Sequence, residues 1–406
     1  MDTSKVLKIL FAVIVAEVIS FGVVIPIVPL LFTEPSSKFF ILEGLSRQMG
    51  YIILGLTIGL YPLGQFISTP LLGELSDVYG RKRIIQLSIL GTVISSAVFA
   101  VGVMKGSFIV LFVSRFFNGL TGGLISVAQA TIADVTDKAD KSKNFGILGV
   151  AFGVGFMMGP FLGGVLSTDM FALLGITTPF WFAAAVSGLS GIFVTLTLQE
   201  TSPMKKDSIN WRKPFSQLKK GLRIPGIRKL LGANFFYFSG FAFFTTFIPV
   251  FLVERFGFSQ LSTGNFFFYI GVLAIIGQGF LVPRVFDRFP EEKVMPITFF
   301  LTGLFILLQP FSPNLTVFLA LVTLFSLNNS LTNVSLNSLV SNASPTEDQG
   351  LALGTNQSLR ALGNAFPSML SGVAAAAFMS STPLMISGII LMTAASVYVA
   401  AERMSE

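Results

Sequence analysis

Residues 73–83 read GELSDVYGRKR, and five of these eleven residues are charged. Apolar runs of about twenty residues each lie on both sides of this stretch, which is the length that an α-helix needs to cross a hydrocarbon core of about 30 Å. A short charged stretch between two such runs predicts two membrane-spanning helices that are joined outside the bilayer. The glycines at positions 73 and 80 suggest a tight connection between them.

The composition of the whole chain supports a membrane protein. The 406 residues are 52% hydrophobic and 12% charged, with a mean hydropathy of +0.78, whereas about a quarter of the residues of a soluble domain are charged. A β-barrel would show short alternating segments instead of long apolar runs. The absence of Cys excludes disulfides and thiol chemistry, and the absence of His leaves proton transfer to carboxylates or other groups. We attribute the net charge of +7 to positive residues in cytoplasmic loops rather than to a surface that binds nucleic acid.

Twelve spans follow from the apolar runs. Their limits are 7–32, 50–72, 84–104, 108–133, 144–167, 179–198, 229–253, 263–282, 294–311, 315–340, 350–378 and 383–401. We therefore expect an all-α membrane protein with twelve transmembrane helices. The first run is too long for a signal peptide, so it is expected to remain in the protein as a helix.

The distribution of positive charge predicts the orientation. With the N-terminus in the cytoplasm, only four Lys and Arg residues fall in loops on the opposite side, and two lie deep within spans. All the others lie on the cytoplasmic side, which places both termini there. The outer four are Lys38, Arg47, Lys105 and Arg255.

The longest hydrophilic stretch, 199–228, divides the chain into two parts. It predicts an N-terminal six-helix bundle (1–198), a cytoplasmic linker and a C-terminal six-helix bundle (229–406). Within the linker, KPFSQLKKGLR (213–223) is either an amphipathic helix on the anionic inner leaflet or a solvated segment.

A sequence offset of about 207 residues relates the two bundles. The spans 144–167 and 350–378 are both glycine-rich and contain Pro160 and Pro367, and Asp77 and Asp287 follow the second and eighth spans. Duplicated bundles around a central cavity are a common plan among transporters.

Four stretches resemble the major facilitator superfamily. GELSDVYGRKR resembles its signature loop, Gly-x-x-x-Asp-x-x-Gly-Arg-Arg/Lys, and RFFNGLTGGLISVAQATIAD (115–134) resembles its fourth-helix arginine motif. GVAFGVGFMMGPFLGG (149–164) is similar to the fifth-helix motif of drug/proton antiporters. AEVISFGVVIPIVPLL (16–31) resembles the first helix of tetracycline-type exporters, with Glu17 where an Asp is usual.

The resemblance implies roles for several residues. A cytoplasmic gating latch would have the start of the span 350–378 as its partner, and Pro290 in place of a glycine makes a second, symmetric latch doubtful. The fifth-helix motif would let that helix pack tightly in the outward-closed state. The latch residues are Gly73, Asp77, Gly80, Arg81 and Lys82, and the antiporter motif residues are Gly155, Gly159, Pro160 and Gly163. From its own chemistry Asp77 can pair with Arg81 or face a helix N-terminus, and Gly73 can allow close backbone approach.

Ionisable groups inside a membrane are costly and usually functional. The predicted spans contain Glu17, Arg115 and Arg360, all near mid-depth, and Glu17 is the only acid well inside one of them. Burial favours the neutral carboxyl and a nearby guanidinium favours the carboxylate, so these three groups can act together as a proton switch. The alternatives are a permanent ion pair for Glu17 and helix-to-helix hydrogen bonding for the arginines. Asp134 is expected at the cavity mouth, tethering Lys138 or Lys143.

Neutral polar side chains within the spans are candidates for substrate binding, or alternatively for hydrogen bonds between helices. Three of them form one stripe at i, i+4 and i+8 of the span 315–340. The candidates are Gln129, Asn234, Tyr237, Asn329, Asn333, Asn337 and Gln357.

These observations favour one function and leave others open. The leading interpretation is proton-coupled efflux of a lipophilic small molecule or drug, in the manner of multidrug or tetracycline resistance, by alternating access. The alternatives are a uniporter or symporter for a sugar, metabolite or organic ion, and a transport-inactive receptor or scaffold. We expect no enzymatic activity, cofactor, metal or nucleic-acid partner, and a monomer in a cell membrane, with the bacterial inner membrane favoured.

Overall fold

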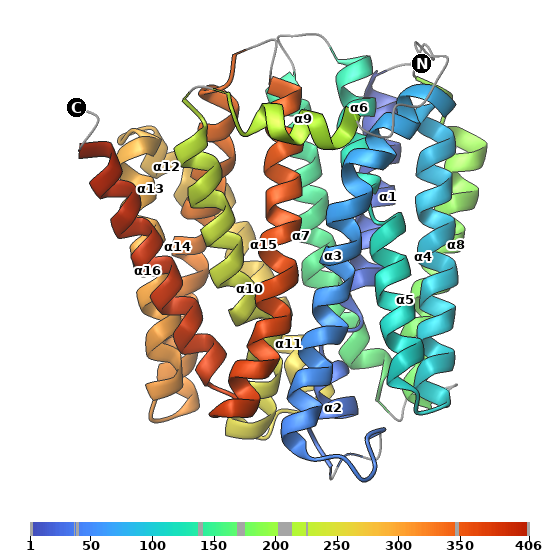
Figure 1. Cartoon of the computed structure of the whole chain (residues 1–406), viewed down its shortest axis with the longest axis vertical. Helices are drawn as coiled ribbons and strands as arrows, with labels where there is room; N and C mark the ends of the chain where they lie inside the picture. The colour runs from blue at the N-terminus through green and yellow to red at the C-terminus, as the bar shows by residue number, and fades with distance from the viewer. Residues whose placement is uncertain are drawn as a thin grey trace. The chain divides into compact units, whose positions relative to one another are not determined.

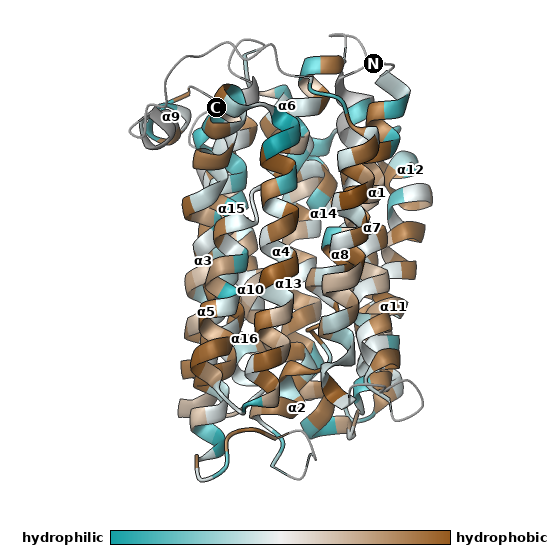
Figure 2. Cartoon of the chain, turned by 90° about the vertical axis from the view of Figure 1, so that its right-hand side faces the viewer, coloured by the Kyte–Doolittle hydropathy of each residue, from teal (hydrophilic) through white to brown (hydrophobic). Residues whose placement is uncertain are grey.

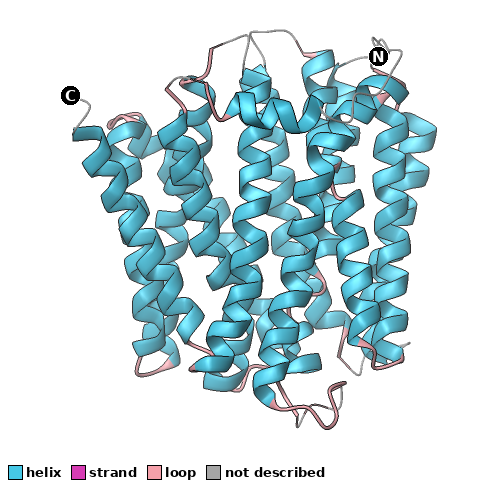
Figure 3. Ribbon diagram, in the orientation of Figure 1, coloured by secondary structure: helices cyan, strands magenta, loops and turns pink. Residues whose placement is uncertain are grey.

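The computed structural model describes residues 3–35, 37, 40–136, 141–168, 175–201, 213–224, 226–345 and 349–403. Across these ranges the regular structure is helical, without strands (Figure 3). The reason is the solvent: hydrocarbon offers no hydrogen-bond partner, so a spanning segment must pair its N–H and C=O groups within its own helix. The predicted all-α class is confirmed.

Figure 1 shows the course of the helices along the chain. Their bounds are α1 (Thr3–Gly22), α2 (Val28–Phe32), α3 (Arg47–Tyr79), α4 (Arg81–Met104), α5 (Phe108–Thr121), α6 (Leu124–Val135), α7 (Lys141–Leu166), η1 (Gly175–Thr177), α8 (Thr178–Thr197), α9 (Lys213–Gly221), α10 (Arg228–Phe256), α11 (Gln260–Ile276), η2 (Gly277–Leu281), α12 (Val282–Phe286), α13 (Glu291–Leu308), η3 (Gln309–Phe311), α14 (Leu315–Asn342), α15 (Gln349–Ala377) and α16 (Thr382–Arg403).

Ten helical segments of the described chain are long and apolar enough to cross a membrane. The predicted spans 7–32 and 350–378, which correspond to α1 with α2 and to α15, are not among them. The reasons differ: α1 is strongly apolar but contains three charged residues, two lysines and Glu17, whereas the stretch TNQSLR (355–360) lowers the hydropathy of α15. The count of twelve spans and the cytoplasmic termini therefore remain predictions.

Several predicted spans are interrupted in the structure. The span 7–32 breaks between α1 and α2, where Pro26 lacks the N–H that a continuous helix needs, and Pro29 lies in the first turn of α2, where a proline is tolerated. The span 108–133 breaks at Gly122 and Gly123 between α5 and α6, and the span 263–282 passes through the π-helical turn η2. In contrast, α3 runs unbroken over 33 residues despite Pro62 and Pro70 within it.

The chain divides into two compact units. Unit 1 comprises Met1–Leu45, Leu60–Ser216 and Phe258–Phe268, and unit 2 comprises Ser46–Gly59, Gln217–Gly257 and Tyr269–Glu406. Helices α3 and α11 thus contribute residues to both units. The bundles predicted at 1–198 and 229–406, with a linker between them, remain a proposal about the organisation of the sequence.

The same packing order occurs within each unit. In unit 1, α1 packs along α7 and α8, and α4 packs along α8 and α5. In unit 2, α10 packs along α15 and α16, and α13 packs along α16 and α14. These pairs correspond one to one along the chain, so the repeated packing agrees with the duplication inferred from the sequence offset.

Glycines of α7 bring its backbone against α1. A Cβ atom at Gly155 would lie 2.6 Å from the Cβ of Val18, and one at Gly159 would lie 2.8 Å from the Cα of Gly22. Gly163, one turn further, faces the carbonyl of Val23. Small residues at this spacing allow two helices in a membrane to pack at backbone distance. The antiporter-motif glycines therefore form a helix-packing seam, which we call the α1–α7 seam.

The exposed faces of the helices are apolar. On α4, Leu90 is 54% exposed, and on α8, Leu189 and Leu196 are 66% and 78% exposed. Hydrophobic residues dominate the middle of the helices, and hydrophilic residues gather toward their ends (Figure 2). An apolar surface of this extent is suited to contact with lipid.

The α1–α7 seam predicts that replacing either of two glycines of α7 by alanine changes thermal stability in opposite directions. Gly159→Ala should lower thermal stability in detergent, because its Cβ meets backbone atoms of α1, and overpacking costs about 1–3 kcal/mol. Gly153→Ala is the control, since a Cβ there meets no atom within 4 Å, and Ala is the better helix former by about 1 kcal/mol. A Gly159→Ala variant as stable as Gly153→Ala would contradict the seam.

Candidate functional site

The charged stretch 73–83 is mostly helical. Helix α3 continues through Glu74 and Asp77 to Tyr79, α4 begins at Arg81, and Gly80 alone connects them. The expectation of a loop is corrected: charged side chains beyond the apolar run can be solvated while the backbone stays helical. Gly80 has φ of +97°, a conformation that residues with a Cβ rarely adopt, so its predicted role in the turn is confirmed.

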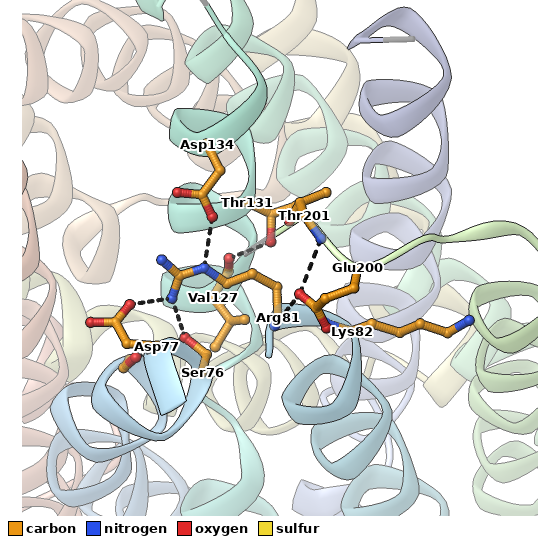
Figure 4. A network of polar contacts seen from close by, with 10 residues as sticks. Ser76, Asp77, Arg81, Lys82, Val127, Thr131, Asp134, Glu200 and Thr201 are labelled. Atoms are coloured by element: carbon orange, nitrogen blue, oxygen red, sulfur yellow. Dashed lines mark hydrogen bonds and ion pairs between the residues drawn. The ribbon is translucent and has the colours of Figure 1, made fainter. Parts of the chain in front are cut away.

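Arg81 is the centre of a polar network at this turn (Figure 4). One of its terminal nitrogens, Nη1, lies 2.7 Å from Oδ1 of Asp77 and also donates to the hydroxyl of Ser76. Its Nε donates to Oδ2 of Asp134 at 2.9 Å. Arg81 is 8% exposed, so this bridge from α3 to α6 lies largely out of water, where charge-assisted hydrogen bonds are stronger.

Two expectations about this region change. Asp134 binds Arg81, whereas Lys138 and the side chain of Lys143 lie outside the described residues. A Cβ at Gly73 would meet only Ser126 Oγ at 3.6 Å, which is ordinary contact, so close backbone approach at Gly73 is not found. The start of α15 as the partner of the latch remains a prediction.

Glu200 is a member of this network that the sequence analysis missed. Its Oε1 accepts from the backbone N–H of Arg81 at 2.8 Å, and its Oε2 accepts from that of Lys82 at 3.2 Å. Lys82 Nζ in turn donates to the carbonyl of Thr195 at 2.8 Å, near the end of α8. The available signal was an acid directly after the sixth predicted span, but nothing local related it to a turn more than a hundred residues earlier.

Glu17 lies in α1 with its carboxyl group facing polar side chains of two other helices. Thr92 on α4 and Ser187 on α8 are the polar neighbours of this carboxyl group. Its Oε1 is enclosed and has no hydrogen-bond partner among the described residues, although the residue as a whole is partly exposed. A carboxyl group held this way has a free acceptor position for a proton or for water.

Arg115 lies on α5 and interacts electrostatically with Tyr61, as does Glu17. Its guanidinium carbon lies 4.4 Å from the ring centroid of Phe99, and its buried Nε has no hydrogen-bond partner in the described part of the chain. The ion pairs of the described residues do not include one between Glu17 and Arg115. A permanent Glu17–Arg115 ion pair is therefore absent, and Tyr61 is electrostatically linked to both groups.

Unit 2 contains a similar arrangement around Arg360. The guanidinium carbon of Arg360 lies 4.3 Å from the ring centroid of Phe238, and Arg360 interacts electrostatically with Tyr237. The Tyr237 hydroxyl donates to Oδ1 of Asn329 and also contacts Asn333. Each unit thus combines an arginine, a phenylalanine face and a tyrosine.

The structure separates the other candidate substrate residues by environment. Asn234 is fully buried, and its amide donates to the carbonyls of Leu230 and Leu336, so it joins α10 to α14. Asn337 is exposed and its amide donates to Asn333 Oδ1 at 2.9 Å. Gln129 and Gln357 are partly exposed. Asn329 and Asn333 are the members of the predicted stripe that meet Tyr237.

A second polar cluster in unit 2 joins α3 to α10. The Tyr51 hydroxyl donates to Oε1 of Glu254 at 2.7 Å, and Arg47 Nε lies 3.7 Å from the same oxygen. The Tyr51 ring also packs edge-on against Phe247, with 5.9 Å between centroids. Further along, α3 also lies close to α15, since a Cβ at Gly55 would be 2.8 Å from the carbonyl of Ser368.

Comparisons with known proteins point to one family. The model of the Major Facilitator Superfamily matches residues 10–367 and 274–404. The chain is 27% identical over 311 residues to the tetracycline resistance protein, class C, of Escherichia coli, covering 73% of this chain and 71% of that protein.

Two solved structures are similar in fold. The human organic anion transporter MFSD10 (TETRAN) superposes with a TM-score of 0.74 at 22% identity, over 98% of this chain and all of the other. The D-xylose-proton symporter superposes with a TM-score of 0.78 at 17% identity, over 98% and 97%.

The Tyr51 cluster predicts an order of stabilities for two tyrosine variants of unit 2. Tyr51→Phe removes a hydrogen bond to a carboxylate, worth about 1.5–3 kcal/mol, whereas Tyr269→Phe removes a neutral one to Thr323, worth about 0.5–1.5 kcal/mol. Tyr51→Phe should therefore lower the unfolding temperature in detergent more than Tyr269→Phe does. An equal or reversed order would mean that the Tyr51–Glu254 contact does not stabilise the fold.

Proposed function

This chain belongs to the Major Facilitator Superfamily, and from that premise we propose that it exports a lipophilic small molecule or drug in exchange for protons. The family and fold are those of transporters, and the chain is a multi-pass protein of the cell membrane. The proposed cycle is alternating access by two six-helix bundles with both termini in the cytoplasm.

The proposal of proton coupling rests on the surroundings of the Glu17 carboxyl group. A carboxyl group inside a membrane is costly and usually functional, and this one has an enclosed oxygen with no hydrogen-bond partner among the described residues. Burial favours its protonated form, while an approaching cation favours the carboxylate. Because Arg115 lies on Phe99 rather than on Glu17, the acid is not neutralised permanently and can take up and release a proton.

The proposed coupling involves the two electrostatic neighbours of Tyr61. Protonation of Glu17 removes one of the two charges that act on Tyr61, leaving that of Arg115. The balance of charge in α1, α3 and α5 then changes with each proton. A substrate whose binding favours the unprotonated carboxyl would be exchanged for a proton.

The efflux direction rests on resemblance and packing together. The α1–α7 seam uses the glycines of the fifth-helix motif, and a tetracycline resistance protein is among the relatives. Among the proposed substrate residues, Tyr237, Asn329 and Asn333 offer a few polar groups beside aromatic rings, which suits a planar lipophilic compound. Gln129 and Gln357 are retained as partly exposed candidates.

A second candidate function is transport of an organic anion or another polar solute by uniport or symport. It is favoured by the position of Arg360 beside Tyr237, because a guanidinium near neutral hydrogen bonders can bind an anionic group. The similar folds of an organic anion transporter and of a proton symporter are compatible with it.

The deciding experiment is transport by the purified protein in proteoliposomes with an imposed pH gradient. The solutes are a panel of lipophilic drugs, organic anions and sugars. Uphill movement of a drug against a downhill proton flux supports antiport. Movement of a solute in the same direction as the protons, or independently of them, supports the second candidate.

Glu17→Gln is predicted to abolish gradient-driven uphill transport, because the amide of Gln neither binds nor releases a proton at the pH values of the assay. Exchange of labelled for unlabelled solute at equal concentrations should persist, since it needs no net proton movement. Glu43→Gln, at an exposed acid in a connection, is the matched control and should transport normally. Full uphill transport by Glu17→Gln would remove Glu17 from the mechanism.

Asp77→Asn is predicted to reduce the turnover rate more than the affinity for substrate. The change leaves Arg81 with one carboxylate in place of two, which weakens the latch without touching the candidate substrate residues. A loss of roughly tenfold in kcat corresponds to about 1.4 kcal/mol. Equilibrium binding of the transported solute should change by less than twofold, and an unchanged kcat would argue against a latch at this turn.

A further inference from the structure

We propose that Glu200 is a positioning residue of the latch, which acts by capping the N-terminus of α4 and thereby fixing the place of Arg81. This inference rests on the transport cycle proposed above. It assigns a role to a residue at the start of the linker, outside the signature stretch 73–83. Three separate features of the structure support it: the cap geometry, the conformation of Gly80 and the reciprocal contact between α4 and α8.

The first feature is the cap itself. The first N–H groups of a helix have no acceptor within the helix, and a short polar side chain just before the helix usually supplies one. Gly80 occupies that position in α4 and has no side chain to do so. The two oxygens of Glu200 accept from the N–H groups of Arg81 and Lys82 instead. The carboxylate also lies at the positive end of the helix dipole, where a negative charge is stabilised.

The second feature is the space at Gly80. A Cβ atom there would lie 2.7 Å from Cδ of Glu200 and closer still to its Oε2. The absence of a side chain at position 80 therefore does two things: it permits the positive φ, and it leaves room for a carboxylate from the segment that follows α8. This gives the second glycine of the signature stretch a partner within the same unit.

The third feature is that the contact is reciprocal. Glu200 caps the start of α4, while Lys82 Nζ donates to the carbonyl of Thr195 in the last turn of α8 and Gln86 donates to its hydroxyl at 2.7 Å. A cation at the C-terminus of a helix is stabilised by the dipole just as an anion is at the N-terminus. The first turn of α4 and the last turn of α8 thus hold each other in register.

The consequence for the latch follows from geometry. Arg81 must present Nη1 to Asp77 and Nε to Asp134 at the same time, at 2.7 and 2.9 Å. Arg81 is the first residue of α4, and the first turn of a helix is the part most prone to fray when it lacks a cap. Glu200 fixes the backbone of Arg81, so that one guanidinium can bridge carboxylates on α3 and α6. Glu200 therefore acts on the network through the backbone of Arg81.

The test combines amide exchange with transport kinetics. In Glu200→Ala the amides of residues 81–84 should exchange faster than in the wild-type protein, and kcat should fall roughly fivefold, the factor expected for loss of one cap, with substrate affinity retained. Glu200→Gln, which keeps one carbonyl oxygen, should lie between the two. Glu292→Ala is the matched control, because it removes an exposed acid from the first turn of α13.

A double variant separates positioning from general destabilisation. If Glu200 acts through Arg81, Glu200→Ala combined with Arg81→Ala should turn over no more slowly than Arg81→Ala alone. Additive losses, or protection of residues 81–84 that is the same in Glu200→Ala as in wild type, would overturn the assignment. Absence of transport by the wild-type protein on the whole panel would overturn the proposed function, whereas amide exchange tests the cap independently of it.

Discussion

The close approach of helix backbones at glycine is the constraint on which unit 1 depends. In hydrocarbon the hydrophobic effect does not drive one helix against another, so packing at short distance and hydrogen bonds must do it. Gly155, Gly159 and Gly163 satisfy that requirement along α1. Because Val18 and Gly22 form the opposing surface, the seam also fixes the rotation of α1 about its axis. That rotation places the Glu17 carboxyl against Thr92 and Ser187.

Polar interactions are concentrated where the packing of apolar side chains ends. At the turn between α3 and α4, Arg81 is held by two carboxylates through its side chain and by a third through its backbone. In unit 2, Glu254 accepts a hydrogen bond from the hydroxyl of Tyr51 and lies near Arg47. Both clusters join segments distant in sequence; the first is centred on a shared donor, Arg81, and the second on a shared acceptor, Glu254. The apolar helices fix the general arrangement, and the clusters fix particular contacts.

Much of the fold could be predicted from local sequence. Length and hydropathy are enough to identify most spans, and the i, i+4 spacing of Asp77 and Arg81 is enough to predict their ion pair. The contacts that were missed involve partners distant in sequence: Glu200 with Arg81, Tyr51 with Glu254, and Arg115 with Phe99. No periodicity encodes such pairs, because they depend on how separate helices pack. Asn234 shows a related limit, since a buried amide between helices and one facing a cavity have the same sequence signature.

Helix α3 has a particular mechanical position. Its first part, to Gly59, belongs to unit 2 and the remainder to unit 1, yet the helix is continuous, and Pro62 lies just past that boundary. Proline removes one backbone hydrogen bond and so makes a helix easiest to bend at that point. With a rise of about 1.5 Å per residue the part of the helix beyond Pro62 is about 25 Å long, and a bend of about five degrees at Pro62 would displace its tip by about 2 Å. A bend at Pro62 would therefore re-aim the charged end of α3, with Asp77, relative to the first part of the same helix.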